Sequence, residues 1–89
     1  MAVREIPIVN KLGLHARAAA KLVQVASHYE ANITLQHNGK EVSGKSIMGV
    51  MMLAAGMGST ISVIASGPDE EAALDEIENL IRDRFGESE

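Results

Sequence analysis

The run Gly13-Leu14-His15-Ala16-Arg17-Ala18-Ala19 combines a nucleophilic side chain, a permanent cation and the predicted start of a helix. The first backbone N–H groups of a helix lack intrahelical partners and lie at the positive end of its dipole, so they can bind phosphate. A phosphoryl group on His15 would lie within reach of the N–H groups of Ala16 and Arg17 and of the Arg17 guanidinium, which suits phosphate oxygens. On this local pattern alone, a helix cap or a solvated side chain is the competing interpretation of His15.

This run resembles the active-centre signature of the HPr family, the histidine-containing phosphocarrier proteins of the bacterial phosphotransferase system. The resemblance extends over essentially the whole chain, through Asn38-Gly39-Lys40, the run from Lys45 to Met51 and Gly67-Pro68-Asp69-Glu70. The family usually has proline directly after the arginine, where this chain has Ala18. Since alanine is the best helix former, we expect the exchange to preserve the helix. The sugar-transporting branch and a regulatory branch, such as the nitrogen-related one, both remain open.

The resemblance implies a carrier that is a substrate of enzymes rather than an enzyme. His15 would accept a phosphoryl group from Enzyme I, which depends on phosphoenolpyruvate, and pass it to a downstream IIA-type protein. Ser46 matches the regulatory serine of the family, so an HPr kinase/phosphorylase is a further possible partner. Residues matching Ile47, Met48 and Met51 form the apolar docking patch of the family, and we expect them to bind partners here. Ser46 can also be explained as a helix N-cap alone.

Length and composition agree with a small carrier. The 89 residues predict a single domain spanning 1–89, and we expect a monomer. The chain contains no cysteine, which excludes disulfides and thiolate metal sites and suits the cytoplasm. We find no signal peptide or long apolar run, so export and membrane insertion are not expected. The net charge of −4 disfavours nonspecific binding to nucleic acid or anionic lipid. We expect no cofactor.

Alternating and β-branched segments predict four strands. The first covers Val3 to Val9, and Pro7 favours an edge position because proline cannot donate to a strand ladder. Ile33 and Leu35 begin a hairpin whose turn is Asn38-Gly39 and whose return strand is Lys40 to Ser43. The fourth strand covers Ser59 to Ala65.

Helical periodicity predicts three helices between and after these strands. The first covers Ala16 to His28. Ser46 caps a short second helix, which runs to about Leu53 and is ended by Gly56 and Gly58. The third has Asp69 as its N-cap and an ion pair between Glu78 and Arg82 at i,i+4. Its apolar stripe consists of Ala73, Leu74, Ile77, Leu80 and Ile81.

The element order βαββαβα predicts an α+β fold in which three helices cover one face of a four-stranded antiparallel sheet. The family's open-faced sandwich, with strand order 1-4-2-3, satisfies this arrangement and places the Pro7 strand at an edge. Four of the five methionines fall between Met48 and Met57. A helix of two turns can bury only part of its apolar residues, so we assign Val50 and Leu53 to the core and expect exposed thioethers beside them.

The remaining polar residues favour ordinary structural roles. His28 fits a helix C-terminus and His37 an exposed strand position, and the three histidines have no ligand spacing, so we expect no metal site. A small protein-binding or RNA-binding module with the same element order is the alternative function, since fold does not settle function. The RNA version is disfavoured because the two aromatic residues, Tyr29 and Phe85, lie outside the predicted strands.

Overall fold

The computed structural model describes residues 1–88 and contains one sheet of four antiparallel strands in the order β1-β4-β2-β3. The strands are β1 (Ala2–Pro7), β2 (Asn32–His37), β3 (Lys40–Ser43) and β4 (Thr60–Ser66). β4 lies between β1 and β2, and the register places Ile6 opposite Ile61 and Leu35 opposite Val63. β2 and β3 form the predicted hairpin, in which Asn38 and Gly39 both have positive φ, as a type I′ turn requires.

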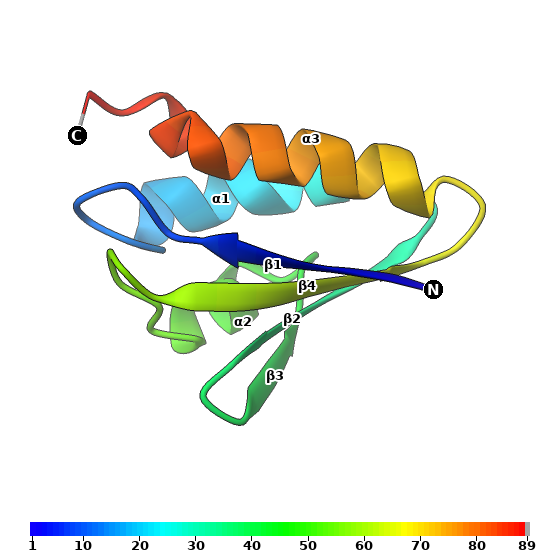
Figure 1. Cartoon of the computed structure of the whole chain (residues 1–89), viewed down its shortest axis with the longest axis horizontal. Coiled ribbons are helices and arrows are strands. Elements are labelled where there is room, and N and C mark those ends of the chain that lie inside the picture. Colours follow the sequence, from blue (N-terminus) through cyan, green and yellow to red (C-terminus); the bar gives the residue numbers. More distant parts are fainter. Residues whose placement is uncertain (89) are drawn as a thin grey trace.

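Three helices pack on one face of this sheet: α1 (Ala16–Ala26), α2 (Ile47–Met52) and α3 (Glu70–Arg82). A short 3₁₀ segment, η1 (Arg84–Gly86), follows α3. α1 and α3 run side by side above the strands, and the N-terminus and the C-terminal segment lie toward opposite ends of the molecule (Figure 1). The α+β open-faced sandwich predicted from the sequence is therefore confirmed, including the edge position of the Pro7 strand.

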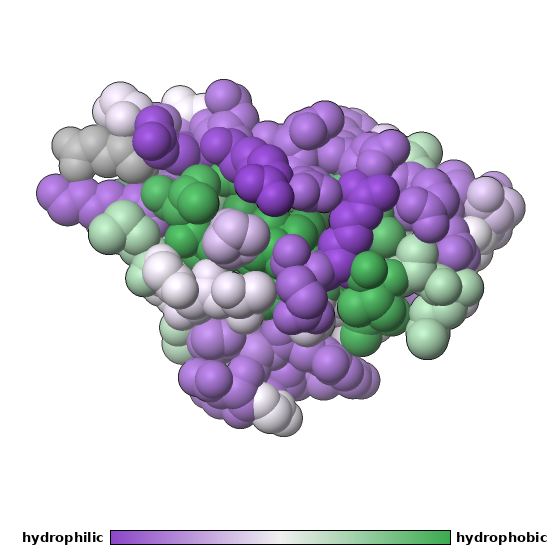
Figure 2. Space-filling view, viewed as in Figure 1, coloured by the Kyte–Doolittle hydropathy of each residue, from purple (hydrophilic) through white to green (hydrophobic). Residues whose placement is uncertain are grey.

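The core lies between the sheet and the helices. Strand residues that face the helices alternate with residues that face solvent, as a half-buried strand requires. Fully buried side chains include Ile61 and Val63 from β4, Leu22 from α1 and Ile77 from α3. In Figure 2 an apolar band is visible between the hydrophilic residues of α3 and those of β1, where this core approaches the surface.

Two helix ends differ from the sequence-based expectation. α1 ends at Ala26, two residues before His28, and Ser27 is its C-cap. α2 ends at Met52, before either of the expected glycines, Gly56 and Gly58, and Ala54, at φ 55°, takes the left-handed conformation just beyond it. Leu53, the C-cap residue, is buried, and we infer that its packing in the core ends the helix before either glycine is reached.

Asp69 occupies the N-cap position of α3, as predicted, and its carbonyl accepts a hydrogen bond from the Ala73 N–H, but its carboxylate has another role. Asp69 precedes α3, but its side chain makes no capping hydrogen bond to that helix. Its two carboxylate oxygens instead accept hydrogen bonds from the backbone N–H groups of Glu30 and Ala31, each at 2.9 Å. Asp69 therefore joins the start of α3 to the loop between α1 and β2, a contact across 38 residues that local spacing cannot reveal.

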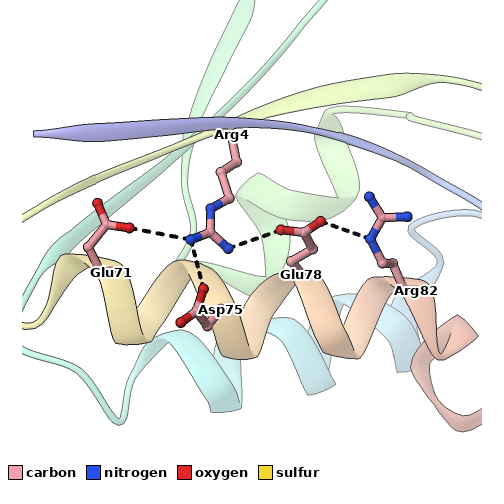
Figure 3. A network of polar contacts seen from close by, with 5 residues as sticks. All are labelled: Arg4, Glu71, Asp75, Glu78 and Arg82. Atoms are coloured by element: carbon pink, nitrogen blue, oxygen red, sulfur yellow. Dashed lines mark hydrogen bonds and ion pairs between the residues drawn. The ribbon is translucent and has the colours of Figure 1, made fainter.

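A network of charged side chains joins the edge strand to α3. Arg4 extends from β1 across to the helix (Figure 3), where its guanidinium lies 2.7 Å from Asp75 and 3.0 Å from Glu78. Glu71 is a third partner, at 3.3 Å, and Glu78 also pairs with Arg82 at 2.8 Å, as predicted. The network ties β1, which has only one strand neighbour, to the helical layer.

We predict that Asp69→Asn removes part of the acid sensitivity of the fold. The hydrogen bond from the Glu30 N–H, together with that from Ala31, holds the pKa of Asp69 below its usual value. A lowered folded-state pKa means that this stabilisation is present above pH ~4 and is lost as the pH falls through the folded-state pKa. Urea unfolding at pH 7 and pH 3 should show a smaller stability loss on acidification in the variant. An equal loss in both proteins would contradict this role.

Candidate functional site

His15 occupies the N-cap position of α1. Its backbone is extended, with φ −73° and ψ 177°, and its carbonyl accepts the first helical hydrogen bond, from Ala19. The Nδ1 atom of the ring accepts a hydrogen bond from the Arg17 backbone N–H at 3.3 Å. The cap interpretation of His15 is thus correct as geometry. The same geometry directs Nδ1 at the free N–H groups of the helix start.

The other ring nitrogen, Nε2, makes a close hydrogen-bonding contact with the Glu87 carboxylate. The His15 side chain is 27% exposed and that of Glu87 15% exposed, so the contact is partly shielded from water. This contact is the main cause that lowers the pKa of Glu87, and burial acts in the opposite direction. Because Nδ1 accepts a hydrogen bond and Nε2 faces a carboxylate, we assign the proton of neutral His15 to Nε2.

Arg17 and Ala16 complete the front of the site. Both residues are exposed, and they line an open depression of about 610 Å³ together with Lys11, Leu12, His15, Glu87 and Ser88. Within residues 1–88, the Arg17 guanidinium makes no ion pair, so its charge is available to an anion. Ala18, which stands where proline is usual in the family, is fully buried in the first turn, and α1 begins at Ala16 without that proline.

The loop before His15 is held by a close approach of two backbone segments. Gly13 has φ +66°, and a Cβ atom there would lie 2.6 Å from the Ala55 carbonyl oxygen. The next residue, Leu14, donates its N–H to that same oxygen at 3.1 Å. Asn10 is fully buried and donates from Nδ2 to the Gly13 carbonyl at 2.8 Å. These contacts fix the backbone that presents His15.

Ser46 is the N-cap of α2, as predicted. Its hydroxyl oxygen accepts a hydrogen bond from the Gly49 N–H at 3.0 Å. The assignment of Val50 and Leu53 to the core is also confirmed, since both are buried. Ile47, Met48 and Met51 are 43%, 70% and 39% exposed, so the residues of the predicted docking patch do reach the surface. α2 packs against α1, which brings Ser46 and His15 to neighbouring helices of one molecule.

The other polar candidates have structural surroundings. His28 is exposed just beyond α1, and His37 ends β2. Neither aromatic residue lies on a strand: Tyr29 lies between α1 and β2 and bonds to Glu76, and Phe85 lies in η1 and is buried. Among residues 1–88, no three His, Cys, Asp or Glu side chains gather as a metal site would require. No helix in this range has the length and hydrophobicity to cross a membrane.

Comparisons with known proteins show which family this chain belongs to. Residues 2–83 match the family model described as the PTS HPr component phosphorylation site. This chain belongs to the HPr family. It is 55% identical over 86 residues to the phosphocarrier protein HPr of Cupriavidus necator, with 97% of each chain covered. It is 47% identical to the phosphocarrier protein NPr of Shewanella violacea, with 96% of this chain and 93% of the relative covered.

A solved structure shares the fold over its full length. The crystal structure of HPr-C-His from Thermoanaerobacter tengcongensis matches with a TM-score of 0.95 and 43% identity, covering all of both chains. HPr proteins are phosphocarriers of the phosphotransferase system, and this chain is accordingly a family member of the carrier type rather than a catalyst.

Sequence reasoning missed two residues of the site, Glu87 and Asn10. Glu87 lies 72 residues after His15, and Asn10 lies 77 residues before Glu87. Neither belongs to a periodic pattern or to the motif around His15, and the acidic residues near the C-terminus resemble the solvated face of a helix. The sequence did offer one signal that the C-terminal segment returns to the core, namely the large apolar residue Phe85 beyond the last helix. The structure confirms that Phe85 is buried.

We predict that Gly13→Ala disturbs the His15 loop beyond the cost of its backbone angle. The matched control is Gly39→Ala, which has φ +79° but no atom within 4 Å of the added Cβ. The free energy of unfolding of the control should fall by about 1 kcal/mol, because alanine is strained in the left-handed conformation. Gly13→Ala should lose clearly more in urea unfolding and should shift the backbone NMR signals of His15 and Ala55. Equal losses in both variants would show that the contact with Ala55 does not matter.

Proposed function

We propose that this protein carries a phosphoryl group on Nδ1 of His15. The observation that supports this most directly is the placement of Nδ1 beside the Arg17 N–H at the start of α1. A phosphoryl group on Nδ1 replaces that hydrogen bond by bonds from the N–H groups of Ala16 and Arg17 to its oxygens. A phosphoryl group on Nε2 would instead lie against the Glu87 carboxylate, where two negative charges repel.

The donor is Enzyme I and the acceptor is a IIA-type protein of the phosphotransferase system. The depression around His15 is open, so a second protein can bring its own phosphorylated side chain to the imidazole. The exposed residues Ile47, Met48 and Met51 supply an apolar docking patch on α2, which packs beside α1. This role requires no cofactor, and we place it in the cytoplasm with the protein acting as a monomer.

Ser46 is the second phosphorylation site that we propose, as the target of an HPr kinase/phosphorylase. A phosphate at an N-cap gains from the helix dipole and from free N–H groups, so the fold tolerates it. It adds about −1.5 to −2 charges directly before the docking patch. A partner that uses this patch then has to desolvate the charge or meet it with its own acidic residues, and phosphorylation therefore weakens docking.

The first test of this proposal concerns the site of labelling. His15→Ala should abolish acid-labile labelling by Enzyme I and phosphoenolpyruvate, measured by intact mass. The fold should be retained, because the side chain is partly exposed and contributes little to the core. His28→Ala is the matched control and should be labelled fully, since His28 lies at the other end of α1. Full labelling of His15→Ala would refute the proposal.

The second prediction separates transfer from stability at Arg17. A guanidinium presents two donors to phosphate oxygens, which a lysine ammonium reproduces poorly. Arg17→Lys should slow transfer from Enzyme I roughly tenfold, the worth of one hydrogen bond to a charged group. Its melting temperature should match that of the wild type, because Arg17 makes no ion pair within residues 1–88. A variant that melts early but transfers normally would make Arg17 a structural residue.

The third prediction tests Ser46. Ser46→Asp should keep the fold and leave His15 in place, while transfer from Enzyme I at subsaturating carrier slows. Ser46→Ala should accept the phosphoryl group at the wild-type rate. Its free energy of unfolding, measured with urea, should fall by about 1 kcal/mol, because the hydrogen bond from the Gly49 N–H is lost. Identical transfer rates for Ser46→Asp and the wild type would reduce Ser46 to its capping role.

A further inference from the structure

The C-terminal segment after α3 is held against the rest of the molecule by a buried side chain and by hydrogen bonds. Phe85 is 1% exposed and belongs to the core cluster, although Arg84, Phe85 and Gly86 all have positive φ. The Phe85 carbonyl accepts a hydrogen bond from the Lys21 ammonium of α1 at 2.6 Å. Three left-handed residues in succession cost free energy, so other contacts must hold them there. Their effect is to return the chain toward the start of α1.

Glu87 is the residue that this return presents to the site. One carboxylate oxygen, Oε1, accepts a hydrogen bond from Asn10 Nδ2 at 3.2 Å, and the other, Oε2, contacts Nε2 of His15. Asn10 itself is fully buried and also bonds to the Gly13 carbonyl. The buried Asn10 amide therefore orients the Glu87 carboxylate through Oε1, while Oε2 faces the imidazole.

We propose that Glu87 is a positioning residue for phosphoryl transfer, acting through Nε2 of His15. This inference rests on the proposed function of His15 as the phosphoryl carrier. A carboxylate at Nε2 keeps the ring proton on that nitrogen, which leaves the lone pair of Nδ1 free to attack. It also fixes the plane of the ring, so that Nδ1 remains directed at the N–H groups of Ala16 and Arg17.

The charge balance of the step gives Glu87 a second effect. The Nδ1 lone pair forms the bond to phosphorus, and the bond between phosphorus and the leaving atom of the donor breaks, its electron pair staying with the donor. Nε2 keeps its proton throughout, so the ring gains one positive charge as the Nδ1–P bond forms. The Glu87 carboxylate faces this charge at Nε2 and stabilises the phosphorylated ring.

The test compares Glu87→Gln and Glu87→Ala with the wild type, using two phosphoryl donors. Enzyme I with phosphoenolpyruvate reports the whole reaction, and phosphoramidate, a small-molecule donor, reports the imidazole without protein docking. Glu30→Gln is the matched control, since it removes one exposed carboxylate beyond the far end of α1. We expect both Glu87 variants to react about tenfold more slowly with both donors. Glu30→Gln should react at the wild-type rate.

A spectroscopic readout separates positioning from stability. The proton on Nε2 should give an observable NMR signal in the wild type and in Glu30→Gln, because Glu87 shields it from exchange with water. Glu87→Ala should lose this signal while its backbone spectrum stays folded. Wild-type rates for both Glu87 variants with phosphoramidate, or an Nε2 proton signal unchanged in Glu87→Ala, would overturn the inference. A wild-type protein that Enzyme I does not label would contradict the proposed function alone, since the phosphoramidate rates and the NMR signal still test Glu87.

Discussion

The sheet of this protein has one apolar face, and the need to cover that face determines where every other element lies. α1 and α3 bury Leu22 and Ile77 against the strands, and α2 contributes Val50 beside them. Once α1 is fixed by its buried stripe, its first turn must project at the edge of the layer, where His15 and Arg17 meet solvent. The placement of the candidate site is thus a consequence of packing, since the residues to which we assign the chemistry occupy the end of a helix that the core holds in place.

The sequence predicts most of this arrangement because the relevant signals are local. Periodic apolar residues define the strands and helices, and a serine before an apolar run predicts the Ser46 cap. His15 was found through its motif, and its hydrogen bond with the Arg17 N–H follows from neighbouring positions. What local spacing could not supply are contacts between distant segments. The Asp69 carboxylate bonds to Glu30 and Ala31 instead of to its own helix, and Glu87 reaches His15 from the other end of the chain.

The charges around His15 are divided between its two ring nitrogens. The Arg17 backbone N–H, at the positive end of the α1 dipole, lies on the Nδ1 side, and the Glu87 carboxylate lies on the Nε2 side. A neutral imidazole in this field is polarised with its lone pair toward the helix start and its proton toward the carboxylate. Such a field favours an incoming phosphoryl group at Nδ1 and opposes one at Nε2. The asymmetry is the physical basis for proposing a carrier rather than a simple helix cap.

The nitrogen that bears phosphorus is therefore the most direct measurement of the account. Protein labelled with ¹⁵N and phosphorylated by Enzyme I can be studied by NMR, through the coupling between phosphorus and each ring nitrogen of His15. Our account predicts coupling to Nδ1, together with large shifts of the Ala16 and Arg17 amide signals as these groups bond to the phosphate. Coupling to Nε2, or a phosphorylated His15 that leaves both amide signals unchanged, would contradict it.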